Sequence, residues 1–305
     1  MSRAPDDFGV IYVAFGPPYL AMALSSALSL RVTNPGVPAC IVTNVTREPP
    51  AVSWWRPSRG DSWRYVERDT GENRLLKTNL YPFSPFGKTL FLDCDTFVVG
   101  SLDRMPRFLE YFDLAIRSVP KASASRRYRD QPILDEQLAH REVTHFNAGV
   151  IGFRKGPETQ GFFSLWNERF RRMGIERDQP ALVEALFLSR ARLLPLREEW
   201  NQGDFWNRGR TYRKSVVIWH YKSRSWDRRI ARLVQSAVTW FGGTEAARQE
   251  VSRYVARRVE YQFRHPVRSR IQALGRELLG PLSKVPERLA GPARWRELVG
   301  GDPPR

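Results

Sequence analysis

The start of the chain has a strand pattern, a helix pattern and a second strand pattern in succession, and this order limits the folds it can adopt. Residues 9–15 form an apolar, β-rich run that ends at Gly16, Pro17 and Pro18. A helix over residues 19–30 and a strand over residues 37–44 are predicted to follow. Two strands joined by a crossover helix pair in parallel, with a right-handed connection. The sequence therefore predicts an α/β fold that begins with parallel strands.

This alternation continues to about residue 225 and then changes. Further elements are predicted as helices over 74–81, 158–173 and 180–190, and strands over 112–116, 148–153 and 216–219. Within residues 88–100, a strand is predicted to stop abruptly at the acids. Residues 45–61 are rich in Pro, Arg and Trp, which indicates an irregular segment. After Trp226, Arg-rich helical segments are separated by Gly-Gly, His-Pro and Gly-Pro pairs. We predict one domain over residues 1–226 and a basic, mainly helical extension over residues 227–305.

The charge of the chain favours anionic partners. Its 305 residues include 49 Lys and Arg against 32 Asp and Glu, a net charge of +17. The basic extension admits three roles, as a solvated helical face, an oligomer contact or a membrane-surface element. In the third role, its Arg residues would meet acidic lipid while aromatic side chains lie at the interface, namely Trp240, Phe241, Tyr254 and Trp295.

The cysteines and the hydropathy of the chain are used to predict the cellular location of the protein. Cys40 and Cys94 are far apart and lack metal-ligand spacing, so neither a disulfide framework nor a zinc site is indicated. The first residues carry no apolar signal segment, and no run of about 18 apolar residues occurs. We expect a cytoplasmic protein that is neither secreted nor membrane-spanning, with peripheral contact to the inner face of the membrane through the basic extension.

A pair of carboxylates closes the predicted strand in "TLFLDCDTF". The run ahead of Asp93 and Asp95 would deliver them to the carboxyl end of a strand, where open α/β sheets bind ligands. Two carboxylates this close repel unless a cation lies between them, and Mn²⁺ or Mg²⁺ takes oxygen ligands. Such an ion could also bind the diphosphate of a nucleotide-sugar.

The same pair has other interpretations. A D-x-D at a strand end can be a solvated turn or a helix cap. It can also begin a haloacid dehalogenase-like phosphatase, in which Asp93 would be the phosphoryl-accepting nucleophile and Asp95 the general acid and base. Against the phosphatase, Phe97 occupies the fifth position of the motif, and about ninety residues with a nucleotide-type strand-helix-strand precede it.

With its flanks, the segment "LLKTNLYPFSPFGKTLFLDCDTFVVGSLDRM" resembles the glycogenin-like family, glycosyltransferase family 8, and its GT-A relatives. The resemblance covers about residues 9–226 and implies a Rossmann-like mixed sheet flanked by helices, with the basic extension outside it. It also implies that Lys77 approaches the donor phosphate or sugar, and that Asp93, Cys94 and Asp95 form the metal-binding and donor-binding stretch.

Other motifs follow in the order of that family. The opening "IYVAFGPPYLAMALSSALSL" is similar to its first strand, nucleotide loop and helix, which implies donor contacts along the loop. The residues implied there are Tyr12, Ala14, Phe15 and Tyr19, with Tyr19 at the base. "FNAGVIGF" resembles the strand that brings Asn147 to the sugar and lets the backbone at Ala148 and Gly149 approach the donor.

The later motifs complete the implied site. "DQPALVEALF" resembles the helix start that brings Asp178 and Gln179 to the sugar hydroxyls or the reacting face, and with Asn147 these are the candidate catalytic residues. "VVIWHYKSRSW" presents His220 as the third metal ligand, with Lys222 or Arg224 as a phosphate-binding cation. This last motif departs from the family, because the glycine expected after the histidine is absent.

Structural alternatives accompany these assignments. Asn147 could satisfy backbone groups, Tyr19 could pack on a helix face and Asp178 could cap a helix. His220 could be a hydrogen-bonded structural residue. Trp54, Trp55 and Trp63 could line an acceptor groove or pack over an irregular loop.

The function that these motifs predict is transfer of a sugar from a nucleotide-sugar, a UDP-sugar by the resemblance, to a hydroxyl of a glycan, glycolipid or protein acceptor. The resemblance implies Mn²⁺ or Mg²⁺ as cofactor and retention of configuration. The alternatives are the phosphatase, a GT-A fold kept as an inactive binding module, and a basic nucleic-acid-binding protein. The last has no recognised motif, so no specific nucleic-acid partner is expected.

Overall fold

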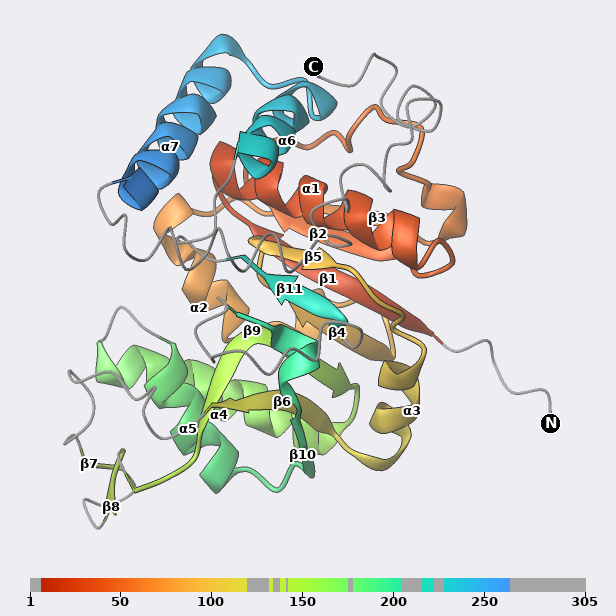
Figure 1. The fold of residues 1–305 in the computed structure, drawn as a ribbon. Helices are drawn as coiled ribbons and strands as arrows, with labels where there is room; N and C mark the ends of the chain where they lie inside the picture. Colours follow the sequence, from red (N-terminus) through yellow and green to blue (C-terminus); the bar gives the residue numbers. More distant parts are fainter. Residues whose placement is uncertain are drawn as a thin grey trace.

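The computed structural model of the chain describes residues 7–119, 132–133, 138–140, 142–174, 178–203, 216–221 and 228–263. Its centre is a seven-stranded mixed sheet with the strand order β10-β6-β9-β4-β1-β2-β3 (Figure 1). These strands are β1 (Phe8–Ala14), β2 (Ala39–Thr43), β3 (Ser62–Tyr65), β4 (Lys88–Leu92), β6 (Leu114–Val119), β9 (His145–Arg154) and β10 (Leu193–Leu196). The strand β9 runs antiparallel to β4 and β6, and the other neighbouring pairs are parallel.

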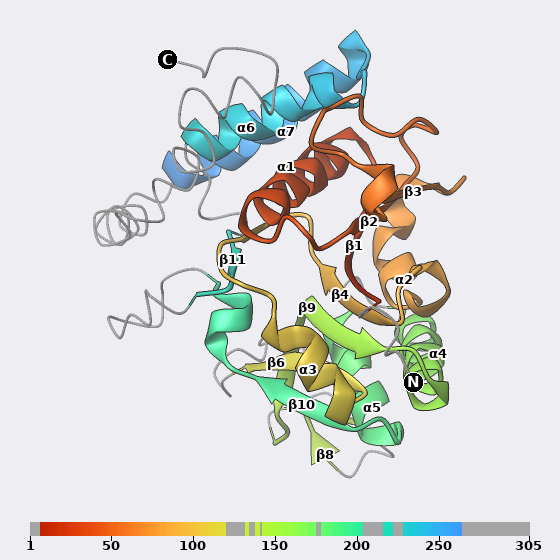
Figure 2. The same ribbon diagram turned by 90° about the vertical axis from the view of Figure 1, so that its right-hand side faces the viewer.

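Helices cover both faces of this sheet (Figure 2). They are α1 (Pro17–Thr33), α2 (Asn73–Lys77), α3 (Arg104–Tyr111), α4 (Pro157–Met173), α5 (Gln179–Leu188), α6 (Arg228–Trp240) and α7 (Glu245–Phe263). Alternate residues of a strand face opposite sides of the sheet. In β1, Val10 and Tyr12 accordingly belong to the apolar core beneath α1, whereas Ile11 and Val13 belong to the core beneath α4 and α5. Both faces of the sheet are therefore buried.

The expected α/β class and mixed sheet are confirmed, with differences in detail. The helix expected from residue 19 begins at Pro17, where a first-turn proline loses no hydrogen bond. The expected end of a strand at the acids is confirmed, because β4 stops before Asp93; the strand that follows, β5 (Thr96–Val98), was not predicted and pairs antiparallel with β11 (Ile218–His220). The sequence patterns did not predict β3, α3, β10 or the short pair β7 (Pro132–Ile133) and β8 (Leu138–Ala139).

The first two helices of the extension pack on the rest of the protein. Val234 of α6 and Val251 of α7 are fully buried in the same apolar cluster as α1. The break expected between these helices is present at Gly242, which has a φ of 64°. The breaks expected after residue 263 lie outside the described residues. The domain boundary at residue 227 stays a prediction.

Burial corrects the expected membrane-facing role of two aromatic residues. Trp240 lies edge-on against Trp54, with ring centroids 5.7 Å apart, and Phe241 is also buried, so neither side chain is available to an interface. Tyr254 is only partly exposed, and Trp295 lies outside the described residues. In the part of the chain that the structure describes, no helix has the length and apolar character needed to cross a membrane.

Candidate active site

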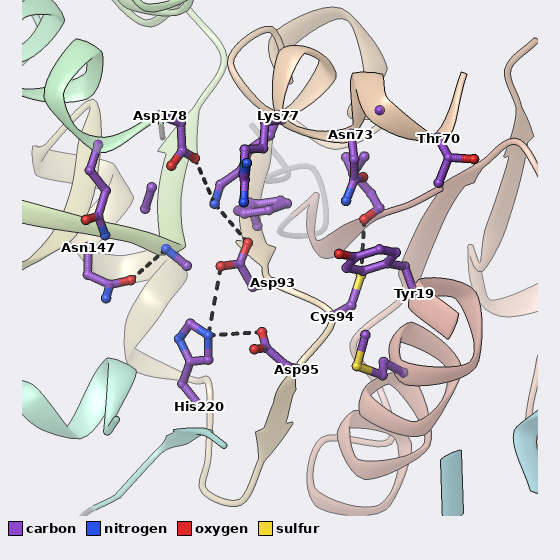
Figure 3. Close-up of a pocket in the computed structure, with 18 of the residues that line it drawn as sticks. Tyr19, Thr70, Asn73, Lys77, Asp93, Cys94, Asp95, Asn147, Asp178 and His220 are labelled. Atoms are coloured by element: carbon purple, nitrogen blue, oxygen red, sulfur yellow. Dashed lines mark hydrogen bonds and ion pairs between the residues drawn. The ribbon is translucent and has the colours of Figure 1, made fainter. Parts of the chain in front are cut away.

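A pocket of about 590 Å³ lies at the carboxyl end of β4 (Figure 3). On one side, which we call the strand side, it is lined by residues carried on or next to strands: Asp93, Asp95, Asn147, Gly149 and His220. On the other, the helix side, it is lined by residues of helices, including Tyr19 of α1, Asn73 of α2, and Tyr254 and Arg258 of α7. Lys77, at the end of α2, lies between the two sides.

The carboxylate pair and the histidine meet on the strand side. The Nε2 atom of His220 lies 3.0 Å from Oδ1 of Asp95 and 3.9 Å from Oδ2 of Asp93. One ligand atom of each residue falls within 4.8 Å of the others. The His220 side chain is only 5% exposed, whereas those of Asp93 and Asp95 are 29% and 30% exposed. Two carboxylate oxygens and an imidazole nitrogen facing an open pocket suit a divalent ion such as Mn²⁺.

The backbone explains why these three residues converge. After β4 ends, Thr96 Oγ1 donates to the carbonyl of Asp93 at 2.8 Å and closes a tight turn. The chain then enters β5, whose partner β11 places His220 opposite Thr96. The Tyr221 N–H also donates to the carbonyl of Asp95 at 3.0 Å. Pairing of two short strands thus brings residues over a hundred positions apart in sequence into one cluster.

A buried hydrogen-bond network fixes the ring of His220. Its Nδ1 lies 3.0 Å from Oδ1 of Asn201, which can only accept, so Nδ1 is engaged there and Nε2 is the nitrogen directed at the carboxylates. Asn201 Nδ2 in turn donates to Oδ1 of Asn147 at 3.1 Å. Arg117 Nη1 holds the Asn201 carbonyl at 2.6 Å. This arrangement is typical of a metal-binding histidine oriented by a second residue.

Gly149 has a steric role on the strand side. A Cβ atom at this position would lie 2.4 Å from Cε1 of His220 and 2.9 Å from Oδ2 of Asp93. Its backbone is held as well, because its N–H donates to Asn147 Oδ1 and its carbonyl accepts from the Asp93 N–H, both at 2.8 Å. Pairing between β6 and β9 jumps from Ile151 to Asn147 here, a local irregularity of the kind found beside active sites.

A cation links two acids at the centre of the pocket. Lys77 Nζ lies 2.9 Å from Oδ1 of Asp93 and 3.1 Å from Oδ2 of Asp178. Burial alone lowers the pKa of Lys77, but Asp178 and Asp93 outweigh that effect and hold it above its ordinary value. Trp166 Nε1 donates to the Asp178 carbonyl at 3.0 Å and fixes the start of α5. The ammonium group is therefore charged at neutral pH and fixed in place.

This pocket is lined by several residues that the sequence predicted to contact the donor or the metal. They are Tyr19, Lys77, Asp93, Cys94, Asp95, Asn147, Asp178, Gln179 and His220. Asp178 makes no side-chain cap for α5. Burial, followed by the charge of Asp93, raises the pKa of the Cys94 thiol, which donates to the Val13 carbonyl at 3.1 Å. The thiol is therefore protonated and part of the wall.

Three other residues that were expected to contact the donor lie outside the pocket. The side chains of Tyr12, Ala14 and Phe15 are fully buried in the core and do not line the pocket. The Tyr12 hydroxyl accepts from Ser26 at 3.1 Å, and Ser26 in turn contacts Thr96, so Tyr12 supports the turn that follows Asp93. Strand alternation directs its ring away from the site. Lys222 and Arg224 lie outside the described residues.

The tryptophans weighed as an acceptor groove form a packing cluster instead. Trp54 and Trp55 are buried, and their rings meet edge-on at 6.3 Å. Trp55 and Trp63 meet edge-on at 5.8 Å, and Trp63 Nε1 donates to the Thr46 carbonyl at 2.9 Å. These contacts support the packing interpretation of the irregular segment over residues 45–61.

Sequence patterns missed several residues of the site. Asn201 shapes the strand side, and Thr70, Asn73, Tyr254 and Arg258 line the helix side. Gly149 was expected beside the donor, but its steric role was not. The motif "FNAGV" contained Gly149, but its contact with His220 needed the fold to be known. Asn201 lies in a 3₁₀ turn (Glu198–Asn201) with no motif of its own.

Comparison with solved structures places this site on a known fold. The galactosyltransferase LgtC, solved in complex with donor and acceptor sugar analogues, aligns with a TM-score of 0.51 at 16% identity over 79% of this chain and 99% of LgtC. The bifunctional glycosyltransferase WbbM aligns with a TM-score of 0.53 at 15% identity over 85% of this chain and 53% of WbbM. The chain has the GT-A fold. No protein-family model and no curated protein sequence matches it.

This likeness confirms the fold that the resemblance to the glycogenin-like family implied. It does not favour a haloacid dehalogenase-like phosphatase. At this level of identity the likeness concerns the fold, so an activity has to be argued from the pocket itself.

Proposed function

We propose that this protein is a metal-dependent glycosyltransferase that uses a nucleotide-sugar, preferably a UDP-sugar, as donor and a glycan hydroxyl as acceptor. The observation that carries the proposal is the cluster of Asp93, Asp95 and His220 in the same pocket as the Lys77–Asp178 ion pair. A site of this composition suits a diphosphate leaving group attached to a polar sugar.

Different residues of the pocket would bind different parts of the donor. Asp93, Asp95 and His220 would hold Mn²⁺ or Mg²⁺, which as a Lewis acid offsets charge on the diphosphate. The ammonium group of Lys77 adds a fixed positive charge at the same place. Asn147 and Asp178 lie across the pocket from Tyr19 (Figure 3), which supports assigning the sugar to the strand side and the nucleoside to the helix side.

The proposed reaction retains configuration. The acceptor oxygen bonds to the anomeric carbon on the face that the diphosphate leaves, the bond from that carbon to the phosphate oxygen breaks, and the acceptor proton passes to the departing phosphate. The pocket offers support for this route: Asp93 and Asp178 contact Lys77, and Asp95 contacts His220. With Asp93 and Asp95 as proposed metal ligands and Asp178 paired with Lys77, these three carboxylates are engaged by cations, which makes them poor nucleophiles.

The test combines binding and turnover of the full chain. UDP-, GDP- and CMP-sugars are screened by thermal shift with Mn²⁺, and hydrolysis or transfer is then measured with Mn²⁺ and with a chelator. Asp95→Asn should reduce metal-stimulated turnover by about a hundredfold or more, because it removes a charged ligand. Asp103→Asn, at an exposed site before α3, makes the same chemical change as a control.

Two outcomes would overturn the proposal. Metal-stimulated turnover in Asp95→Asn equal to that of the unchanged protein would remove the metal role. Hydrolysis of sugar phosphates that depends on Asp93, with no binding of any nucleotide-sugar, would favour phosphatase chemistry.

A further inference from the structure

Helix α7 reaches the pocket from outside the stretch that resembles the glycogenin-like family. Tyr254 and Arg258, both on α7, are lining residues. The Tyr254 ring lies 6.0 Å from that of Tyr19, at an angle of 57°. Two helices far apart in sequence thus meet through an aromatic pair at the helix side of the pocket.

The placement of α7 is set by its apolar face. Ala247, Val251 and Val255 are buried against the cluster that contains α1 and α6. Spacings of three and four residues put Tyr254 and Arg258 next to this face, where the buried contacts give way to the pocket. The two side chains are therefore directed by core packing.

Arg258 brings a positive charge with spare hydrogen-bond donors. Its Nη2 donates to the Tyr254 hydroxyl at 2.9 Å, and its guanidinium carbon lies 4.9 Å from the centre of that ring. Burial raises the pKa of Tyr254 to about 12, so the tyrosine is neutral and does not compensate the charge of Arg258. Among the described residues, no carboxylate lies within ion-pair distance of Arg258.

The position of this charge relates it to the metal cluster. Arg258 and Asp95 line the same pocket, and the Tyr254 ring that Arg258 contacts lies beside Tyr19. Arg258 is therefore next to the proposed nucleoside position, in the pocket that also contains the metal cluster. A diphosphate that joins a nucleoside at Tyr19 to a sugar has to run through this pocket. Lys77, another cation of the pocket, is already engaged by two acids.

We infer that Arg258 is a binding residue for the diphosphate of the donor and that Tyr254 positions it, so that α7 completes the donor site. This inference rests on the proposed function, because it assigns a contact within the same pocket. It gives a part of the basic extension a role in recognising a nucleoside diphosphate.

The experiment measures affinity of the full chain by calorimetry with Mn²⁺ present, using UDP and uridine as probes. Arg258→Ala should weaken UDP binding by about tenfold to a hundredfold, because a hydrogen bond to a charged group is lost. Uridine has no phosphate, so its affinity should stay within about twofold of that of the unchanged protein. Arg257→Ala removes the same charge from an exposed position of α7 and should leave both affinities unchanged.

The controls separate the possible failures. If Arg258→Ala lowers the melting temperature below the assay range, Arg258→Gln carries the test, since it removes the charge but keeps a longer polar side chain. Equal UDP affinity in the Arg258 and Arg257 variants, or an equal loss for UDP and uridine, would overturn this inference alone. Failure of the unchanged protein to bind UDP with Mn²⁺ would overturn the proposed function and this inference together.

Discussion

The two sides of the pocket are held in place by different forces. On the strand side, buried hydrogen bonds connect His220 to Asn201, Asn201 to Asn147, and Asn147 to the backbone of Gly149. On the helix side, Tyr19 and Tyr254 meet through their rings. Hydrogen bonds with fixed directions hold atoms to narrow geometry, whereas aromatic packing tolerates small displacements. The side that would hold the metal is therefore the more tightly specified one.

This difference suits the chemistry proposed for each side. Metal ligands and charged groups near a reacting centre lose much of their effect when displaced by about 1 Å. A nucleoside needs a flat surface and a few polar contacts, which helices can provide. Substitutions on the strand side should consequently affect metal binding, and those on the helix side should affect binding of the nucleoside or its diphosphate without changing the affinity for the metal.

The largest loss of Mn²⁺ affinity on the strand side is expected from Gly149→Ala. The added methyl group would overlap His220 Cε1 and crowd Asp93, and the backbone hydrogen bonds on both sides of Gly149 prevent relief by a shift. Affinity for Mn²⁺, measured by calorimetry, should fall by about a hundredfold. A matched control is Gly161→Ala in α4, where a Cβ atom would meet nothing within 4 Å. Unchanged Mn²⁺ affinity in Gly149→Ala would show that the metal, if bound, lies elsewhere.

A smaller effect is expected from Asn201→Ala. This change removes the acceptor for His220 Nδ1 without touching a proposed ligand, so the ring can rotate and change tautomer. Loss of such a partner weakens metal binding by about 10- to 100-fold. Asn201→Asp keeps an acceptor at that position and should recover most of the Mn²⁺ affinity. If both variants lose affinity equally, Asn201 has a structural role that does not act through the orientation of His220.

Sequence patterns predicted the ordered core of the fold because its strands and helices have clear apolar periodicity. The strands around Val10, Ile41 and Leu90 are buried on both faces, and the acids after Leu92 mark the strand end. Elements with weaker patterns were missed: β3 is only partly buried, and β10 contains Pro195. Edge strands of this kind carry little periodic signal.

The site was predicted where a residue type and its chemistry coincide in one motif, as at Asp93, Asp95 and Lys77. It was missed where the role depends on a neighbour distant in sequence. Asn201 matters because β11 brings His220 beside it, and Arg258 because α7 packs on α1. Tyr12 shows the reverse error, since a tyrosine inside the motif turns into the core by strand alternation.

The smallest effect is expected from a substitution on the helix side, at Tyr19. Tyr19→Ala removes the ring proposed to contact the base, and stacking of a base on an aromatic ring contributes about 1–3 kcal/mol. Some of this loss will be offset because the Tyr254 ring remains beside the vacated position. We expect UDP and uridine affinities to fall by about tenfold alike, with Mn²⁺ affinity unchanged, whereas Tyr19→Phe should bind all three as the unchanged protein does. A parallel fall in Mn²⁺ affinity would mean that the aromatic pair also holds the metal ligands in place, and the two sides of the pocket would then be one mechanical unit.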